Sequence, residues 1–100
     1  MAAEVRFEWD EGKNRANQAK HGVSFEEATT VFSDEHGLLI EDPDHADNGE
    51  ERFVLLGLSA EFRVLLVCHC YREEERVIRL ISARKANRAE QREYFERKQR

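Results

Sequence analysis

The 100-residue chain contains little cysteine, proline or glycine, and it has no long apolar run. Its longest such run, residues 64–68, is far shorter than the ~20 residues that a membrane-spanning helix needs. No apolar core of the signal-peptide type stands near the N-terminus. With two cysteines and one proline, neither a disulfide-stapled scaffold nor a Pro-rich disordered chain is expected. We therefore expect a folded cytoplasmic protein that does not bind a membrane.

The sequence also lacks the patterns of the common metal and phosphate sites. Cys68 and Cys70 are two residues apart in a strand-like run, so both should lie on one face, in a geometry that disfavours a disulfide between them. The same alternation turns His69 away from them, and no second ligand pair at zinc spacing exists. The aspartates within residues 42–47 fail the spacing of a calcium loop, and no phosphate-binding glycine motif is present. We expect neither a metal nor a cofactor.

The chain does contain enough apolar residues for one core, together with many charges. Hydrophobic residues make up 40% and charged residues 37%, which predicts a single domain over residues 1–100. The net charge of −5 is unevenly distributed, since residues 1–60 carry 5 Lys and Arg against 14 Asp and Glu, whereas residues 61–100 carry 11 against 7. Either the basic C-terminal part holds a polyanion locally, or its charges are merely solvated helix surface.

The N-terminal third predicts a strand and two helices. Residues 5–9 alternate apolar and polar positions, as a strand does. A polar helix is expected over 11–21, with Asp10 as its N-cap and Gly22 as its left-handed C-terminal cap. The side of this helix expected to pack against the protein consists of its small residues, Gly12, Ala16 and Ala19.

A second helix begins at a capping box that runs from Ser24 to Glu27, and a sheet follows it. The two strongest strands are apolar at nearly every position, which predicts central strands covered on both faces. The acidic stretch between the first two of these later strands is expected to be an exposed loop. Strands are expected at about 37–41, 52–59, 63–70 and 77–82, with the loop at 42–51 and a last helix that begins near Asn87 with Glu90 as its capping partner. The order βααββββα predicts an α+β fold, a curved and mainly antiparallel sheet with the two N-terminal helices and the C-terminal helix on one side.

Basic residues on the predicted strands need an explanation. Arg79 interrupts the apolar last strand, where an unpaired charge would be costly. Either an anion-binding groove crosses the sheet, or Arg79 forms an internal ion pair with a carboxylate such as Glu41 or Glu51. The other basic residues on or beside the strands are Arg63 and His69, which share a face, and Arg84 and Lys85.

If such a groove holds RNA, these residue types suit cleavage without a metal. The reaction needs a base for the 2′-hydroxyl proton, a cation at the phosphorus and an acid for the leaving oxygen. Arginine can bind two phosphate oxygens at once, and histidine suits either proton transfer. Lys20 and His21 are candidates because Gly22 ends their helix there, although cations at a helix C-terminus also simply complement its dipole. His69 is a further candidate, but a strand histidine is often structural.

Five stretches of the sequence resemble the BrnT family of bacterial type II toxins across nearly the whole chain. They are "FEWDEGKNRANQAKHGVSFEEATTVF", "DPDH" with "EERFVLLGLS", "RVLLVCH", and "RVIRLISARKANRAEQREY". The resemblance implies a RelE-like toxin fold and metal-independent ribonuclease activity that arrests growth. It also implies a cognate BrnA-type antitoxin with a ribbon-helix-helix DNA-binding half, through which alone the toxin would reach operator DNA.

The resemblance falls on two blocks, but it does not say which matched residues act on RNA. Trp9, Gly22 and Phe25 are interpreted as structural, and the basic residues as functional. The matched positions are Trp9, Asp10, Lys13, Asn17, Lys20, His21, Gly22 and Phe25, and then Ser82, Ala83, Arg84, Lys85 and Ala86. The candidate catalytic residues are His69, His21, Lys20 and Arg79, and the candidate RNA- and phosphate-binding residues are Arg63, Arg84, Lys85 and Lys13.

Two functional hypotheses follow from these observations. The first is a toxin ribonuclease that an antitoxin neutralises. The second is a non-catalytic interaction module, either a decayed toxin or a co-repressor subunit, that only binds its partner. The acidic net charge of −5 keeps the second hypothesis open, because RNA binding without help is weakened by negative charge.

Overall fold

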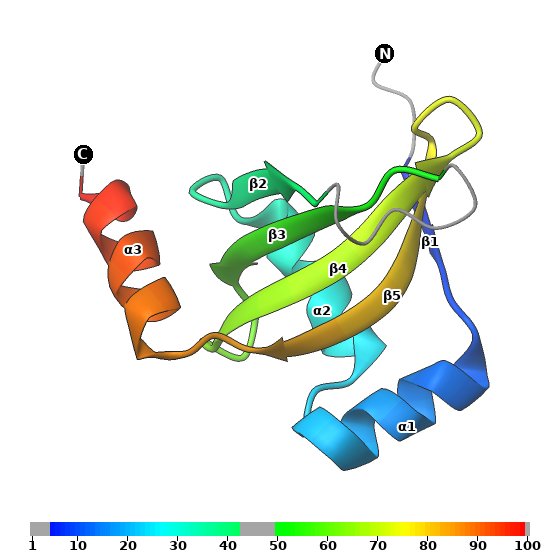
Figure 1. The fold of residues 1–100 in the computed structure, drawn as a ribbon, viewed down its shortest axis with the longest axis horizontal. Helices are drawn as coiled ribbons and strands as arrows, with labels where there is room; N and C mark the ends of the chain where they lie inside the picture. The colour runs from blue at the N-terminus through cyan, green and yellow to red at the C-terminus, as the bar shows by residue number, and fades with distance from the viewer. Residues whose placement is uncertain (1–4, 43–49, 100) are drawn as a thin grey trace.

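The computed structural model describes residues 5–42 and 50–99, and within them five strands form one mixed sheet (Figure 1). The sheet order is β1-β5-β4-β3-β2, in which β2 to β5 pair antiparallel and β1 runs parallel to β5. The α+β class is therefore confirmed. Most of the predicted acidic loop, residues 43–49, lies outside the described residues, as do Asp44 and Asp47 of the rejected calcium pattern. The strands are β1 (Arg6–Glu8), β2 (Leu38–Glu41), β3 (Phe53–Leu58), β4 (Val64–Arg72) and β5 (Val77–Lys85).

The helices begin and end where the capping residues place them. Asp10 caps α1 by accepting a hydrogen bond from the Lys13 backbone N–H, and Gly22 ends that helix with a left-handed φ of 70°, which glycine adopts without strain. Ser24 caps the next helix by accepting from the Glu27 N–H. The helices are α1 (Glu11–His21), α2 (Phe25–Thr30) with the short 3-10 helix η1 (Val31–Ser33) after it, and α3 (Arg88–Lys98), which has the predicted capping box of Asn87 and Glu90.

The main core lies between α2 and one face of the sheet, here called the helix face. In β3 and β4, alternate residues such as Leu55, Leu65 and Val67 point to this face and are buried, as the two-residue period of a strand requires. Phe25 at the start of α2 packs among them with no exposed surface. In Figure 1, α2 accordingly lies behind the sheet.

Among the described residues, a helix covers the opposite face of the sheet, here called the open face, only at one end. There, Tyr94 of α3 packs with Leu56 and Val64, and its hydroxyl donates a 2.6 Å hydrogen bond to Asp34. Two predictions are corrected here. The central strands are not covered by helices on both faces, and α3 does not share the side of α1 and α2, because its docking residues meet strand positions of the opposite parity. No described helix covers the remainder of this face, and its central part is apolar.

The first helix packs through asparagines and not through its small residues. Asn14 and Asn17 are buried, whereas Ala16 and Ala19 are exposed. The Asn17 side chain donates to Ala83 O at 2.8 Å and accepts from Ala83 N at 3.1 Å, so it pairs with β5 as a neighbouring strand would. The prediction of a small-residue packing side is therefore wrong, since hydrogen-bond satisfaction decides which side of α1 faces the sheet.

Candidate functional site

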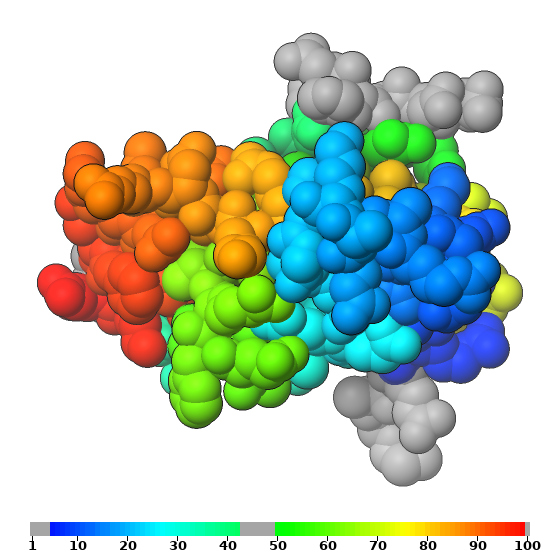
Figure 2. Space-filling view, turned by 90° about the horizontal axis from the view of Figure 1, so that it is seen from below, coloured from blue at the N-terminus to red at the C-terminus, as the bar shows by residue number. Residues whose placement is uncertain are grey.

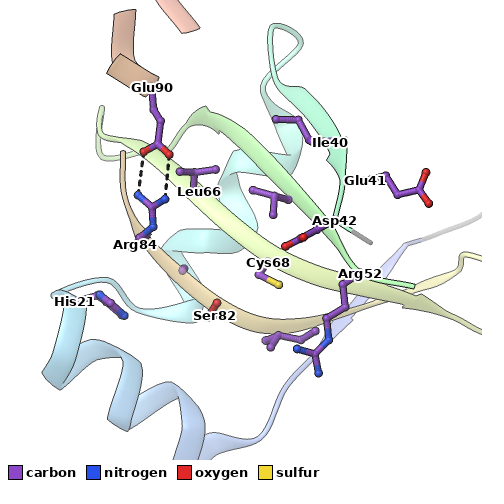
Figure 3. Close-up of a pocket in the computed structure, with 13 residues that line it drawn as sticks. His21, Ile40, Glu41, Asp42, Arg52, Leu66, Cys68, Ser82, Arg84 and Glu90 are labelled. Atoms are coloured by element: carbon purple, nitrogen blue, oxygen red, sulfur yellow. Dashed lines mark hydrogen bonds and ion pairs between the residues drawn. The ribbon is translucent and has the colours of Figure 1, made fainter. Parts of the chain in front are cut away.

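The described residues form a groove on the open face, here called the sheet groove, with a volume of about 510 Å³. Its floor is apolar and comes from the central strands, while charged residues surround it. Figure 3 shows His21 and Arg84 at one end and Asp42 and Arg52 at the other. The lining residues are His21, Ile40, Glu41, Asp42, Arg52, Val54, Leu66, Cys68, Ile81, Ser82, Ala83, Arg84 and Glu90.

Arg84 is the predicted phosphate binder that the fold places in this groove. Strand β5 pairs Arg84 with Leu66 of β4, so the guanidinium stands beside the apolar floor. Its Nη1 and Nη2 donate to the two carboxylate oxygens of Glu90 at 2.9 and 3.0 Å. This bond raises the pKa of Arg84 and holds the pKa of Glu90 below its ordinary value. The pair is a bidentate one, the geometry that arginine also uses for phosphate.

His21 is the predicted catalytic residue that lines the same groove as Arg84. It is the last residue of α1 and is half-buried. Two neighbouring features fix its position. Gly22 ends the helix directly after His21, and the side chain of Asn17, one turn earlier, is hydrogen-bonded to the backbone of Ala83 in β5. Figure 2 shows the end of α1 beside the end of β5. A helix end without an apolar anchor is thus brought to the sheet by hydrogen bonds.

The predicted lysines lie outside the groove. Lys20 and Lys85 are the chain neighbours of His21 and Arg84, and both are exposed. Lys13 is exposed near the start of α1. None of the three is among the residues that line the sheet groove. They can contribute charge to the surface beside it, but the structure does not bring them to its floor.

His69 lies on the other side of the sheet, so its predicted convergence with His21 is corrected. It is 0% exposed on the helix face, and its ring contacts those of Phe32, Phe53 and Tyr71. Its Nδ1 is 3.0 Å from Val67 O and its Nε2 is 3.2 Å from the Tyr71 hydroxyl. A neutral ring that donates through Nδ1 and accepts through Nε2 satisfies both partners. Burial lowers the pKa of His69, in agreement with this neutral form.

Arg63 and Arg79 are held by carboxylates away from the groove. Arg63 forms a two-pronged bond with Glu27, whose side chain is only 3% exposed, and also donates to Gly22 O at 3.0 Å. The Glu27 side chain therefore forms this ion pair and not the side-chain half of the predicted capping box, of which only the bond from the Glu27 N–H to Ser24 is present. Arg79 donates to Glu8 of β1 at 2.9 Å, so of its two predicted explanations the structure shows the ion pair. Its partner is neither Glu41 nor Glu51, because the parallel pairing of β1 brings Glu8 opposite Arg79.

A family model described as the ribonuclease toxin BrnT of type II toxin–antitoxin systems matches residues 9–90. The chain belongs to the BrnT family. The crystal structure of the Brucella abortus ribonuclease toxin BrnT is similar to this chain, with a TM-score of 0.61 and 24% identity over 84% of this chain and 99% of that one. At this identity the likeness supports the fold alone. A comparison with curated protein sequences finds no match.

Several groove residues of this BrnT-family chain were not predicted from its sequence. Arg52 directly precedes β3, Cys68 lies on β4, Ser82 lies on β5, and Glu90 lies on α3. The alternation of β3 and β4 places Cys68 on one face with Leu66, and this pattern was visible in the sequence. Burial raises the pKa of Cys68, so its thiol stays protonated, and both cysteines are free as predicted. Glu90 was assigned only a capping role, since nothing local predicts a second partner.

Two further observations describe the rest of the molecule. Among residues 5–42 and 50–99, no group of three or more His, Cys, Asp and Glu side chains could hold a metal ion. Within the part of the chain that the structure describes, no helix is long and apolar enough to cross a membrane.

Proposed function

We propose that this BrnT-family chain is a metal-independent endoribonuclease with a RelE-like fold, which cleaves RNA in the sheet groove and thereby arrests growth. A BrnA-type antitoxin with a ribbon-helix-helix domain would neutralise it and connect it to operator DNA. The observation that supports this proposal best is that His21 and Arg84, from distant parts of the chain, line one groove. The predicted cytoplasmic site of action stays a prediction.

In the proposed reaction, RNA is its own nucleophile. The 2′-hydroxyl attacks the adjacent phosphorus, and the bond from phosphorus to the 5′-oxygen breaks. Arg84 would stabilise the charge that develops on the phosphate oxygens, and His21 would take the proton of the 2′-hydroxyl or deliver one to the leaving oxygen. The Ser82 hydroxyl is a further hydrogen-bonding group in the groove.

The groove favours single-stranded RNA as substrate. Its floor includes Val54, Leu66 and Cys68, an apolar surface that an unstacked base could cover. Bases are free to leave a stack in single strands, where sequence-specific recognition of RNA mostly occurs. Lys20 and Lys85, the exposed chain neighbours of His21 and Arg84, would bind the flanking phosphates. We assign His69, Arg63 and Arg79 to the stability of the fold.

Expression of the chain without a partner gene tests this function. The wild type is expected to arrest growth, and Arg84→Ala is expected to relieve the arrest because the groove loses its bidentate cation. Arg92→Ala, which removes the same charge from an exposed position of α3, is the matched control and should still arrest growth. Circular dichroism of each purified variant shows whether the fold survives. Arrest by Arg84→Ala equal to that of the wild type would contradict the assigned role.

A second candidate function is that of a binding module without catalysis. The observation in its favour is that three carboxylates, Glu41, Asp42 and Glu90, line the same groove, where they repel a phosphate. This candidate predicts that the folded wild type neither arrests growth nor cleaves RNA, although it still binds its antitoxin. The growth experiment therefore separates the two functions.

A further inference from the structure

The carboxylate of Glu90 is bound to the guanidinium of Arg84, the groove residue on which the proposed function depends. Both of its oxygens accept hydrogen bonds from Arg84, at 2.9 and 3.0 Å, and both residues line the sheet groove (Figure 3). The side chains of Arg84 and Glu90 are 46% and 25% exposed. Arg84 Nη1 also donates to Lys85 O at 3.2 Å, so the guanidinium is held in place on two sides.

We propose that Glu90 is an internal competitor for the substrate phosphate, which must displace this carboxylate from Arg84 before it can bind there. The inference rests on the proposed use of the groove as an RNA site. A carboxylate and a phosphodiester both carry one negative charge and both present two oxygens to the guanidinium fork. A phosphate that entered without displacing Glu90 would meet its repulsion and find one N–H of Nη1 and one of Nη2 already bonded to Glu90.

A second bond keeps Glu90 near Arg84. Its Oε1 also accepts from the Asn87 backbone N–H at 2.8 Å, as the N3 residue of the capping box of α3. The carboxylate is therefore tethered at the first turn of the helix, within reach of the guanidinium. Its affinity for Arg84 is that of a preorganised partner, which costs less conformational entropy than a free anion does.

The dual role of Glu90 allows the competition to be removed while the cap is kept. Glutamine serves as well as glutamate at the N3 position of a capping box, so Glu90→Gln retains an oxygen for the Asn87 N–H. The variant loses the charge that competes with phosphate. Glu93→Gln removes the same charge from an exposed position of the same helix, outside the groove, and is the matched control.

Binding of a fluorescent single-stranded 2′-O-methyl oligoribonucleotide, which lacks the attacking 2′-hydroxyl and cannot be cleaved, tests the proposal when it is measured at several salt concentrations. Glu90→Gln is expected to bind about fivefold more tightly than the wild type, because a partly exposed ion pair no longer has to be broken. The slope of its log–log salt dependence should stay that of the wild type, because the bound phosphate contacts Arg84 in both proteins. Glu93→Gln should match the wild type in both quantities, and Glu90→Ala should repeat the gain if Glu90→Gln fails to fold.

Titration with inorganic phosphate, followed through the NMR signal of the Arg84 side chain, separates this proposal from the proposed function. If phosphate binds Arg84 more tightly in Glu90→Gln than in Glu93→Gln but no variant binds RNA, Glu90 is a competitor and the RNA function is wrong. If all variants cleave RNA and Glu90→Gln gains no affinity for RNA or phosphate over Glu93→Gln, the competition is refuted while the function stands.

Discussion

At the scale of single residues, the surroundings of each basic side chain decide whether it stabilises the fold or faces the groove. Arg63 is paired with Glu27, whose carboxylate also accepts a 2.7 Å hydrogen bond from Ser59. Arg84 is also paired with a carboxylate, but this pair lines the sheet groove. A buried ion pair that loses one partner leaves a costly unpaired charge. The same residue type therefore stabilises the fold at one position and is available for a ligand at another.

Removal of Arg63 is expected to destabilise the protein strongly. Arg63→Ala leaves the buried Glu27 carboxylate without its cation, which should lower the free energy of unfolding by about 3 kcal/mol. Urea denaturation measures this change. The control is Arg88→Ala, at an exposed position of α3, which should stay within about 0.5 kcal/mol of the wild type. Equal stabilities of the two variants would refute the structural role of the pair.

The same ion pair predicts how acid acts on stability. The bond from Arg63 holds the folded-state pKa of Glu27 below its ordinary value of 4.5, so the unfolded chain binds protons first as the pH falls. The stabilisation is fully present well above pH 4.5 and is lost as the pH falls through that value towards the lower folded pKa. Glu27→Gln should lose this part of the acid dependence of the free energy of unfolding.

His69 predicts a pH dependence in a different window. Burial lowers its folded-state pKa from 6.5, so stability should fall as the pH drops below 6.5, by at most ~1.4 kcal/mol per pH unit. His69→Phe removes the group that titrates and should flatten the stability profile between pH 6.5 and the lower folded pKa, whatever its effect at pH 7. Urea denaturation at a series of pH values measures the slope. An unchanged slope in the variant would exclude His69 as its source.

At the scale of elements, the caps and the period of apolar residues were enough to predict most boundaries. The first helix was expected over 11–21, and α1 spans Glu11–His21. The last helix was expected near Asn87, and this residue caps α3. These predictions succeed because a cap is a local hydrogen bond between residues three apart. The packing side of α1 could not be predicted in this way, because Asn17 bonds a residue 66 positions away.

The Asn17 side chain should accordingly contribute more to the free energy of unfolding than other polar residues of α1. Asn17→Ala leaves the N–H and C=O of Ala83 and the carbonyl of Val23 without their side-chain partner, and it should cost about 2–3 kcal/mol. Hydrogen exchange at the Ala83 amide should speed up with it. Gln18→Ala, at the exposed neighbouring position of the same helix, is the control. A slow Ala83 amide in Asn17→Ala would show that α1 is not needed to cover β5.

At the scale of the whole molecule, the acidic chain gathers only part of its predicted site. The sequence identified the relevant residue types, and His21 and Arg84 do line one groove. It could not show that His69 lies on the other face of the sheet, or that Glu8, Glu27 and Glu90 each bind a candidate arginine. Strand alternation predicts which residues share a face, but it does not predict which face a helix covers or which carboxylate a long side chain reaches.

Cleavage of a single-stranded RNA by the purified chain in EDTA tests the central claim most directly. The wild type is expected to cleave, and His21→Ala is expected to be slower by at least about 100-fold, the usual contribution of a general acid or base. The matched control is His36→Ala, which changes a half-buried histidine in the turn before β2, outside the groove, and it should retain the wild-type rate. A folded wild type that leaves the RNA intact, or a His21→Ala variant as fast as His36→Ala, would contradict the account.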